Sequence, residues 1–429
     1  MASFPSDRIR FLLNRLRQRL WIRPLAIALL SIAVAFGSKL ADGTGLGDVV
    51  PEVSAESVET LLDVMASSML VIATFAVASM VAAYASAGTT ATPRTFTLVV
   101  SDDVSQNALA TFVGAFIFSI VALTALKNEY FGAAGLFCLF VLTIATFAIV
   151  ILTFLRWVDR IARLGRLGTT IDKVERAADS ALTRRRAAPT LRGVPVATDR
   201  AQGHPIYAEK VGYVQHVDVP ALQEWAEGCN ARVVVAALPG TFAAPGRALA
   251  YVRTATAGHP VTTGEGVVHA FAIRDDRTFD DDPRFGLVVL SEIAGRALSP
   301  AINDPGTAID VIGTLVRLFV RWSAPAPAAS GEAEPYDRVE VPVLSVMDMF
   351  DDAFTAIARD GAGTVEVSLR LQKALQSLAL VGDDTMQHAA VRHARLALRR
   401  AERALQLDDD VLAVRIAASW AEPTSIDAS

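Results

Sequence analysis

The sequence contains little cysteine and no motif that announces a reaction. Its two cysteines, Cys138 and Cys229, are too few for a disulfide framework, as is typical of a chain kept in a reducing compartment. The six histidines fall in no metal-ligand spacing, and HExxH, CxxC, GxSxG, a phosphate-binding GxxxxGK and a GxGxxG after a strand are absent. We therefore expect no catalytic, metal-binding or cofactor-binding residues and no enzyme. A Ser/His/Asp site assembled from distant residues is the alternative left open.

An acidic run between residues 275 and 282 resembles a metal site only superficially. It lacks the ligand spacing of a calcium loop and the glutamate that closes such a loop. The run predicts a solvated loop that ends where Asp282-Pro283 starts a helix, with a divalent cation as the alternative. Its acidic members are Asp275, Asp276, Asp280, Asp281 and Asp282.

A strong positive charge is also missing. The net charge is −5, and residues 1–189 hold 18 Lys+Arg against 14 Asp+Glu, whereas residues 190–429 hold 22 against 31. An acidic second part argues against nucleic acid as a partner.

Apolar residues are what the sequence has in excess. They make up 52% of the chain, mean hydropathy is +0.38, and the excess is concentrated in the first third. Four runs have the length that a transmembrane helix needs, at about 24–40, 61–86, 108–126 and 130–155. Buried helices of a soluble core are the alternative, but four such long runs with so few charges favour membrane spans.

The basic residues predict how these spans are oriented. Six arginines precede the first span, and arginines recur after the fourth, whereas the loop between the first two spans is acidic. Because cytoplasmic loops carry the excess of Lys and Arg, we expect both termini in the cytoplasm and the protein in the inner membrane of a bacterium. The expected divisions are a basic segment (1–23), four spans (24–155), a basic connector (156–187), a small β-rich module (188–275) and a helical region (276–429).

The second span is rich in small and hydroxyl side chains. In lipid, small residues allow helices to approach closely, so these positions predict contacts within the bundle or between subunits. The alternative is a helix that lines a pore, which small and hydroxyl side chains can do without a buried charge. No span has an ionisable residue near its middle, which disfavours an ion-coupled carrier. The candidate residues are Ser67, Ser68, Thr74, Ala78, Ser79 and Ala82.

Residues 156–186 read as a basic amphipathic connector. Apolar residues recur there at steps of three and four, from Trp157 to Val174, with arginines on the other faces. This pattern predicts a helix that leaves the membrane and lies along anionic lipid headgroups. A calmodulin-like or nucleic-acid contact is the less favoured alternative.

The remaining residues predict an α+β domain, so the fold class is a four-span α-helical membrane protein, N-in/C-in, with a cytoplasmic α+β domain. Strands are expected around GYVQHVD, ARVVVAAL and HAFAI, with a turn-rich PGTFAAPG hairpin. Helices are expected from Pro283 to Leu298, after Pro305, and at about 342–359, 363–380, 384–406 and 409–420.

The stretch RALSPAINDPGTAID, residues 296–310, interrupts two apolar helices. The proline after Ser299 ends the first helix, and Asp304 followed by Pro305 is a standard start for the next. This interpretation leaves Arg296 and Asn303 without a role. We therefore keep Arg296, Asn303 and Asp304 as candidates for a ligand or subunit contact.

Several stretches together resemble one family. They are the four spans, TPRTF…DD…Q…LATFVGAF, GYVQHVD…PGTF and FGLVVLSEIAGRALSPAINDPGTAID, and the most specific is RALSPAINDP. The chain resembles the bacterial predicted membrane proteins called domain of unknown function 2254, and it departs from that pattern at SAGTTATPR. The resemblance implies the architecture and assigns no activity, cofactor or functional residue.

Two hypotheses of function follow. The first is a homo-oligomeric channel or transport-type protein whose cytoplasmic domain assembles or gates it. The second is a membrane-anchored scaffold or signalling protein that binds a cytosolic partner. An enzyme acting on lipid or envelope substrates is a third, disfavoured by the absence of a nucleophile or metal motif.

Overall fold

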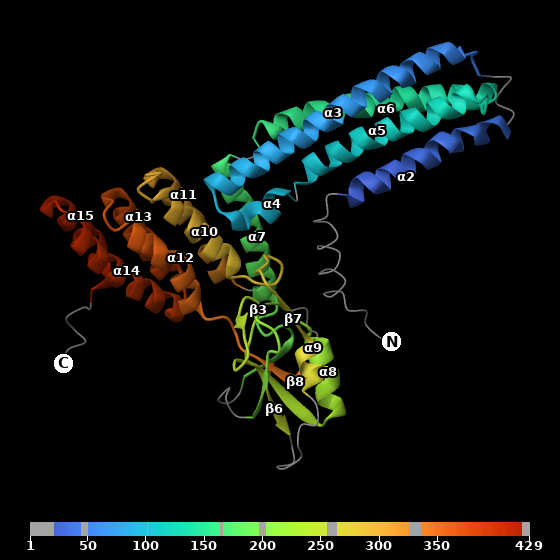
Figure 1. Ribbon diagram of the computed structural model, residues 1–429. Helices are drawn as coiled ribbons and strands as arrows, with labels where there is room; N and C mark the ends of the chain where they lie inside the picture. The colour runs from blue at the N-terminus through green and yellow to red at the C-terminus, as the bar shows by residue number, and fades with distance from the viewer. Residues whose placement is uncertain are drawn as a thin grey trace, which may run out of the picture. The chain divides into compact units, whose positions relative to one another are not determined.

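The computed structural model describes residues 21–43, 50–100, 102–163, 166–196, 203–254, 264–325 and 336–422. The chain divides into two compact units, one ending at Thr170 and one starting at Ile171 (Figure 1). We call the first the membrane unit and the second the α+β unit, and each is described by itself.

Among its described residues, the membrane unit contains four helices that are long and apolar enough to cross a membrane. They are α2 (Ile22–Gly37), which continues as η1 (Ser38–Gly43), α3 (Ala55–Thr90), α5 (Asp103–Lys127) and α6 (Ala133–Ile161). The four predicted spans are confirmed, and most of the helices extend beyond the predicted limits. The helices continue past the apolar runs because helix formation tolerates charged residues at their ends, as at Glu56 and Arg160.

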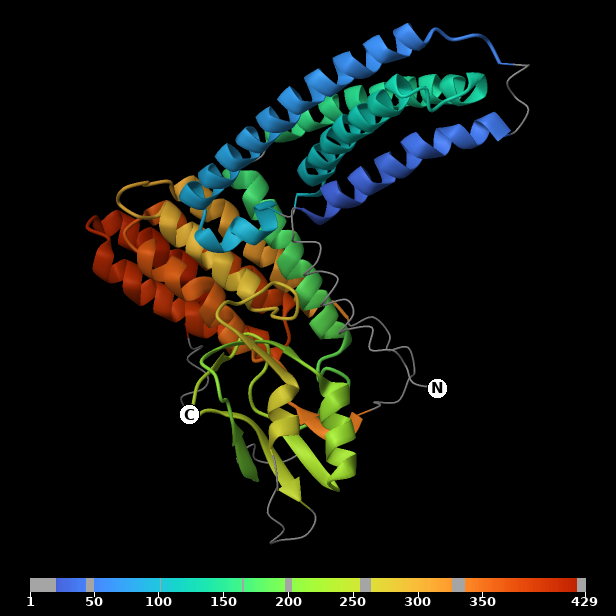
Figure 2. The same ribbon diagram turned by 45° about the vertical axis from the view of Figure 1, so that its right-hand side comes forward.

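Helix α5 is the centre of the membrane unit. It packs against α2, α3 and α6, and α3 also packs against α6 (Figures 1 and 2). Helix α2 lies on α5 where Gly114 leaves no room for a side chain, because a Cβ there would collide with Ile27. The interior is filled by large side chains such as Phe112, Leu139 and Trp157. A single copy therefore has a packed interior.

Contacts at both ends fix the alternating direction of these helices. At the end where α5 begins, Arg23 of α2 donates hydrogen bonds to Asp103 and Asn107. At the opposite end, Asp42 accepts hydrogen bonds from the backbone N–H groups of Gly132 (2.8 Å) and Gly135 (2.6 Å), and so caps α6. Two short elements, η3 (Pro93–Thr95) and α4 (Phe96–Val100), separate α3 from α5.

The basic connector forms two helices instead of the single helix predicted. Helix α6 ends at Ile161, and α7 spans Leu167–Ala187. Ile171, Val174 and Ala178 of α7 are buried, and Gly286 lies against Ala178. The apolar face of α7 is therefore covered by protein. Contact of the connector's arginines with anionic headgroups stays a prediction.

In the described residues of the α+β unit, eight strands form two sheets. The strands are β1 (Gly193–Pro195), β2 (His204–Tyr207), β3 (Gly212–Val217), β4 (Ala231–Val235), β5 (Phe242–Ala243), β6 (Ala248–Thr254), β7 (Phe271–Arg274) and β8 (Tyr336–Val341). The larger sheet has the order β1-β8-β4-β6-β2, and the smaller has the order β5-β3-β7. Helices α8 (Val219–Gly228) and α9 (Glu265–His269) contribute to the same core.

Neither β1 nor β8 was predicted from the sequence, because β1 lies within a Pro-, Gly- and Ala-rich stretch that predicts a linker and β8 follows a similar stretch. Strand β8 pairs in parallel with both β1 and β4, with Val339 opposite Val233. Its residues lie more than 130 positions after the start of β1, between helices of the helical region. The larger sheet of the predicted β-rich module (residues 188–275) is therefore completed by β8, a strand from a later part of the chain that lies between β1 and β4.

From residue 285 onward, the part of the chain that the structure describes also contains the helices α10 (Phe285–Ala297), α11 (Pro305–Ser323), α12 (Val346–Asp360), α13 (Val365–Val381), α14 (Asp384–Ala404) and α15 (Asp408–Ala418). They pack side by side in both views (Figures 1 and 2). The rings of Phe319, Phe350 and Phe354 pack at 4.6–5.6 Å between α11 and α12. The predicted helices after residue 283 are confirmed to within a few residues.

Candidate functional site

The candidate residues of α3 lie on the side that faces away from the interior of the membrane unit. Ser67, Thr74, Ala78 and Ala82 are exposed, and Ser68 and Ser79 are half-buried. The opposite side of α3 supplies the buried residues, which include Met65, Met69, Ala73, Ala76 and Met80. The six candidates therefore do not meet inside one copy of the protein, and the outward side of α3 is free to face lipid or another chain.

The hydroxyl groups on this outward side already have partners in their own helix. Ser67 Oγ donates to the carbonyl oxygen of Asp63 at 3.0 Å, and Thr74 Oγ1 donates to that of Val71 at 2.8 Å. Such bonds satisfy a polar side chain in a low-dielectric environment. These residues can therefore face lipid or a neighbouring helix without leaving a donor unpaired.

The corner between α10 and α11 is built by Asp304. Its backbone N–H donates to the carbonyl of Ala297 at 2.8 Å, and its carboxylate accepts from Thr307 N (3.0 Å) and Thr307 Oγ1 (2.6 Å). These bonds to Thr307 hold the pKa of Asp304 below its usual range. The predicted N-cap is thus confirmed, with Pro305 in the first turn of α11.

The two other candidates at this corner have different surroundings. Asn303 has φ = 49°, a left-handed conformation that asparagine tolerates better than most residues, which explains its place in the turn. Arg296 is exposed in the last turn of α10, where its charge complements the helix dipole. The structure places Arg296, Asn303 and Asp304 in one corner, and contact with a ligand or a subunit stays a prediction.

A buried polar cluster in the membrane unit was not predicted. The Asp102 carboxylate caps α5 by accepting from Ser105 N (3.2 Å) and Ser105 Oγ (2.9 Å), and Arg160 Nε of α6 donates to it at 3.1 Å. Gln106 Nε2 donates to the carbonyl of Val100 at 2.9 Å. We call Tyr84, Asp102, Ser105, Gln106 and Arg160 the Asp102 cluster. Its only sequence signal was the DD…Q part of the stretch that carries the family resemblance.

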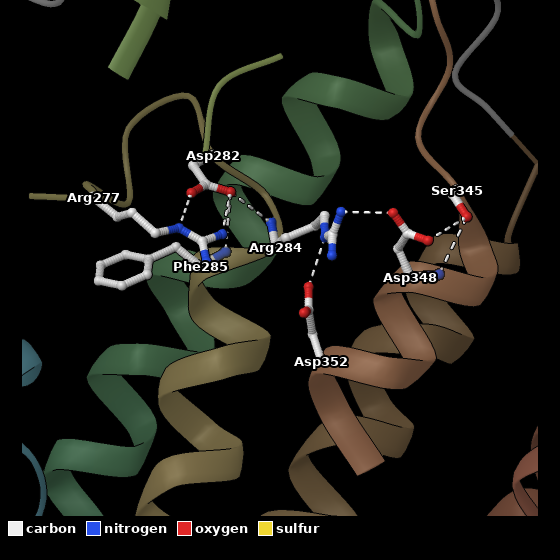
Figure 3. A network of polar contacts seen from close by, with 7 residues as sticks. All are labelled: Arg277, Asp282, Arg284, Phe285, Ser345, Asp348 and Asp352. Carbon is white, nitrogen blue, oxygen red and sulfur yellow. Dashed lines mark hydrogen bonds and ion pairs between the residues drawn. The ribbon is translucent and has the colours of Figure 1, made fainter. Parts of the chain in front are cut away.

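A second polar network joins the sheets to the helices of the α+β unit (Figure 3). Asp282 is almost fully buried and accepts from Arg277 Nε at 2.7 Å and from the backbone N–H groups of Arg284 and Phe285, both at 3.1 Å. Burial raises the pKa of Asp282, against the opposing effect of Arg277. Gly240, at φ = 93°, lies against the same carboxylate, and a Cβ there would collide with it. The expected helix start at Asp282-Pro283 is therefore also a junction between distant segments.

The same network continues into α12 (Figure 3). Arg284 donates to Asp352 at 2.6 Å and to Asp348 at 2.8 Å, and Ser345 caps α12 by accepting from Asp348 N at 3.2 Å. These bonds tie the loop before α10 to the first turns of α12. Most of this network is structural, because each carboxylate is engaged by arginine or backbone N–H groups.

Helix α7 is tied to this part of the unit by charged side chains. Glu175 accepts from Arg317 Nε (2.9 Å) and Nη2 (2.6 Å), which lowers the pKa of Glu175. Arg184 donates to the carbonyl of Asp280. Arg185 is buried near Asp281 and Asp282, and burial lowers its pKa to about 10. The acidic run therefore meets arginines, and no group of three or more metal-ligating side chains occurs among the described residues.

The fold and these clusters define a class of protein: a multi-span, mostly helical membrane protein that carries a large α+β unit. The model of the predicted membrane protein family DUF2254 matches residues 17–377, and the chain belongs to this family. The family resemblance inferred from RALSPAINDP and the other stretches is confirmed.

The relatives of the chain do not indicate an activity. The chain is 36% identical over 115 residues to uncharacterized proteins of two Mycobacterium tuberculosis strains and of Mycobacterium bovis. This match covers 26% of the chain and 22% of each relative, so it spans about a fifth of the length of these curated proteins. No solved structure matches the chain.

Proposed function

We propose that the protein is an oligomeric channel or transport-type protein of the bacterial inner membrane, with the α+β unit as its assembly or gating domain. One observation carries this proposal: the interior of a single membrane unit is filled, whereas small and hydroxyl side chains of α3 lie on its outward side. Large exposed apolar residues such as Val71 and Phe75 lie among them. A path across the membrane would then form between copies of the chain. Small residues are what close contacts between membrane helices require.

The outward side of α3 is suited to such an assembly. Ser67, Thr74, Ala78 and Ala82 recur along it at steps of seven, four and four residues, so they follow one side of a helix. The helix has 36 residues and is about 54 Å long at 1.5 Å per residue, enough to cross the bilayer and continue beyond it. In an oligomer, this side would lie either at the contact between copies or at a central axis.

Cysteine cross-linking in native membranes tests the assembly. In a Cys138→Ser/Cys229→Ser background, Ala78→Cys should form an intermolecular disulfide on oxidation. The matched control is Ile149→Cys. Ile149 is exposed on α6 rather than on α3, so this cysteine should not form an intermolecular disulfide. A chain that stays monomeric in lipid nanodiscs, with no cross-link at Ala78, would contradict the proposal.

Ion flux tests conduction. The purified protein in liposomes should pass a small monovalent ion, and Ala78→Trp should reduce the flux because the larger side chain obstructs the contact or the path. Ile149→Trp serves as the control for insertion and folding. Absence of conductance for the parent protein under varied voltage, tension and pH would eliminate the channel.

The orientation proposed here places both termini and the α+β unit in the cytoplasm. It is supported by the arginines on either side of the spans and by the acidic loop between α2 and α3. Reporter fusions after residues 43 and 429 distinguish the arrangements. A periplasmic reporter should be active only after residue 43, and activity after residue 429 would reverse the orientation.

A membrane-anchored scaffold that binds a cytosolic partner is the second candidate. Apolar side chains on α15 favour it, because Leu407, Leu412 and Ile416 are more than half exposed at one side of the helical layer. Proximity labelling from the C-terminus in living cells should give one stoichiometric partner that is lost in Leu412→Ser/Ile416→Ser. Identical labelling in the parent and variant proteins would contradict the scaffold hypothesis.

A further inference from the structure

Buried polar atoms without a hydrogen-bond partner are concentrated at one end of the membrane unit. In its described residues, the buried side-chain atoms of this kind are Tyr84 Oη, Gln106 Oε1 and Trp157 Nε1. All three belong to the ends of α3, α5 and α6 where the Asp102 cluster lies. Elsewhere in these spans, buried hydroxyls such as those of Ser119 and Thr143 donate to carbonyls of their own helices. In the described residues of the membrane unit, the buried polar atoms without a hydrogen-bond partner are therefore confined to this end.

Two of these atoms belong to one small region. Tyr84 lies within electrostatic reach of Asp102 and packs in a cluster with Val99 and Val100. Gln106 donates through Nε2 to the carbonyl of Val100, which fixes its Oε1 as the atom that lacks a donor. The Tyr84 and Gln106 side chains are 8% and 2% exposed, so neither is simply solvated at the surface.

Leaving such groups unpaired is costly inside a membrane-spanning bundle. A buried polar atom without a partner is strongly destabilising in a hydrocarbon environment, because no bulk water is available to it. Natural proteins resolve such deficits with a bound water that makes two to four hydrogen bonds.

The chemistry of the two atoms selects the ligand. Gln106 Oε1 needs a donor, and Tyr84 Oη can donate or accept. A cation would add a charge beside Asp102, whose charge Arg160 already neutralises, and burial of an uncompensated charge is unfavourable. An anion has no proton for Gln106 and would be repelled by Asp102. A neutral molecule that both donates and accepts satisfies both side chains.

We propose that Tyr84 and Gln106 form an internal site for a bound water molecule at the end of the membrane unit where α5 begins. The water donates one proton to Gln106 Oε1 and accepts the proton of the Tyr84 hydroxyl. Trp157 lies one helical turn before Arg160 on α6, so its buried Nε1 continues the row of buried polar atoms one turn further into the bundle. The site joins α3 to α5, and it does not depend on whether the protein conducts.

A double-mutant cycle tests the shared water. Tyr84→Phe and Gln106→Leu should each lower the melting temperature of the protein in nanodiscs, and the double variant should lose less than the sum of the two. Without a shared water, Tyr84→Phe should leave the melting temperature unchanged or raise it, and Gln106→Leu should lower it only through loss of its bond to Val100. Thr143→Val combined with Gln106→Leu is the matched control, and its effects should add. A neutral effect of Tyr84→Phe, or additive effects of Tyr84→Phe and Gln106→Leu, would overturn the proposal.

A direct measurement covers the case in which a variant does not fold. Water-edited solid-state NMR of the tyrosine-labelled parent protein in bilayers should show fast magnetisation transfer from water to the Tyr84 ring. Transfer as slow as that to Thr143 in a threonine-labelled sample would overturn the proposal. The Tyr84→Phe difference spectrum assigns the signal where that variant folds, and sequential backbone correlations assign it otherwise.

Discussion

Asp102 and Arg160, separated by 58 residues in the sequence, join the first turn of α5 to the last turn of α6. The carboxylate of Asp102 is 2% exposed, and it combines the N-cap of α5 with the charge partner of Arg160. One side chain thus fixes where α5 begins and where α6 ends, at the point where the chain leaves the four spans.

Removal of Asp102 should destabilise the membrane unit strongly. Asp102→Ala deletes the α5 cap and leaves Arg160 without its carboxylate, at a cost of about 3 kcal/mol. The neighbouring Asp103→Ala is the matched control, because Asp103 is 75% exposed and its pair with Arg23 should contribute less than 1 kcal/mol. Unfolding of both variants in mild detergent measures the difference. Equal stability of the two would show that the Asp102–Arg160 contact contributes little.

A side chain at position 114 should separate α2 from α5. Gly114→Leu would place atoms where Ile27 and Ser31 lie, and such overpacking costs about 1–3 kcal/mol. Gly88→Leu is the control, because no atom lies within 4 Å of a Cβ at Gly88. Unfolding in mild detergent should show this loss of stability in Gly114→Leu and not in Gly88→Leu. Equal stability of the two variants would show that α2 accommodates the larger side chain without cost.

The corner after α10 should respond to loss of its cap. Asp304→Ala removes the bonds to Thr307 and should cost about 1 kcal/mol, whereas Asp304→Asn should retain most of the stability. Asn303→Gly should be neutral or slightly stabilising, because glycine adopts positive φ without strain. Chemical denaturation of the full chain measures these effects. If Asp304→Ala instead spares stability and abolishes flux or partner binding, Asp304 belongs to a functional site.

Acid should weaken the packing of α14 through His393. Burial is the main cause that lowers the pKa of His393 to about 4; Asp351 opposes it, and Arg392 and Arg400 act in the same direction as burial. The unfolded chain, with a histidine pKa of about 6.5, therefore binds a proton first as the pH falls. Stability should decline by up to about 3 kcal/mol between pH 6.5 and 4 and change little from this cause above pH 7.

Replacement of His393 identifies this contribution. His393→Gln should flatten the decline of the melting temperature between pH 6.5 and 4. His388→Gln, on the exposed side of the same helix, should leave it in place. A His393→Gln profile as steep as that of the parent protein would assign the acid sensitivity to other groups.

The spans and most helices were predictable because their signals are local. Long apolar runs specify the four spans, and Asp304-Pro305 specifies the start of α11 within a few residues. The limits of the spans were less accurate, because helices continue through charged residues that hydropathy excludes. Strand β8 was missed because its residues, YDRVEV, are half charged and follow a Pro- and Ala-rich stretch. Glu340 in this strand is buried and pairs with Arg253 of β6 at 2.8 Å.

The polar clusters could not be predicted for a different reason. Asp102 meets Arg160, and Arg284 meets Asp348 and Asp352, across 58 to 68 intervening positions. Nothing in the local sequence selects one carboxylate among many for each arginine. The outward position of Ser67 and Thr74 was likewise unpredictable, because nearly every turn of α3 contains small or apolar residues on all sides.

The position of β8 between β1 and β4 sets an order for synthesis of the protein. Ribosomes complete β1 and β4 long before they reach Tyr336, and α10 and α11 are made in the interval. Until β8 arrives, the backbone edges of β1 and β4 lack the partner that separates them in the finished sheet. While its four spans are already being inserted into the bilayer, the nascent chain must therefore prevent these two unpaired strand edges from pairing with other chains.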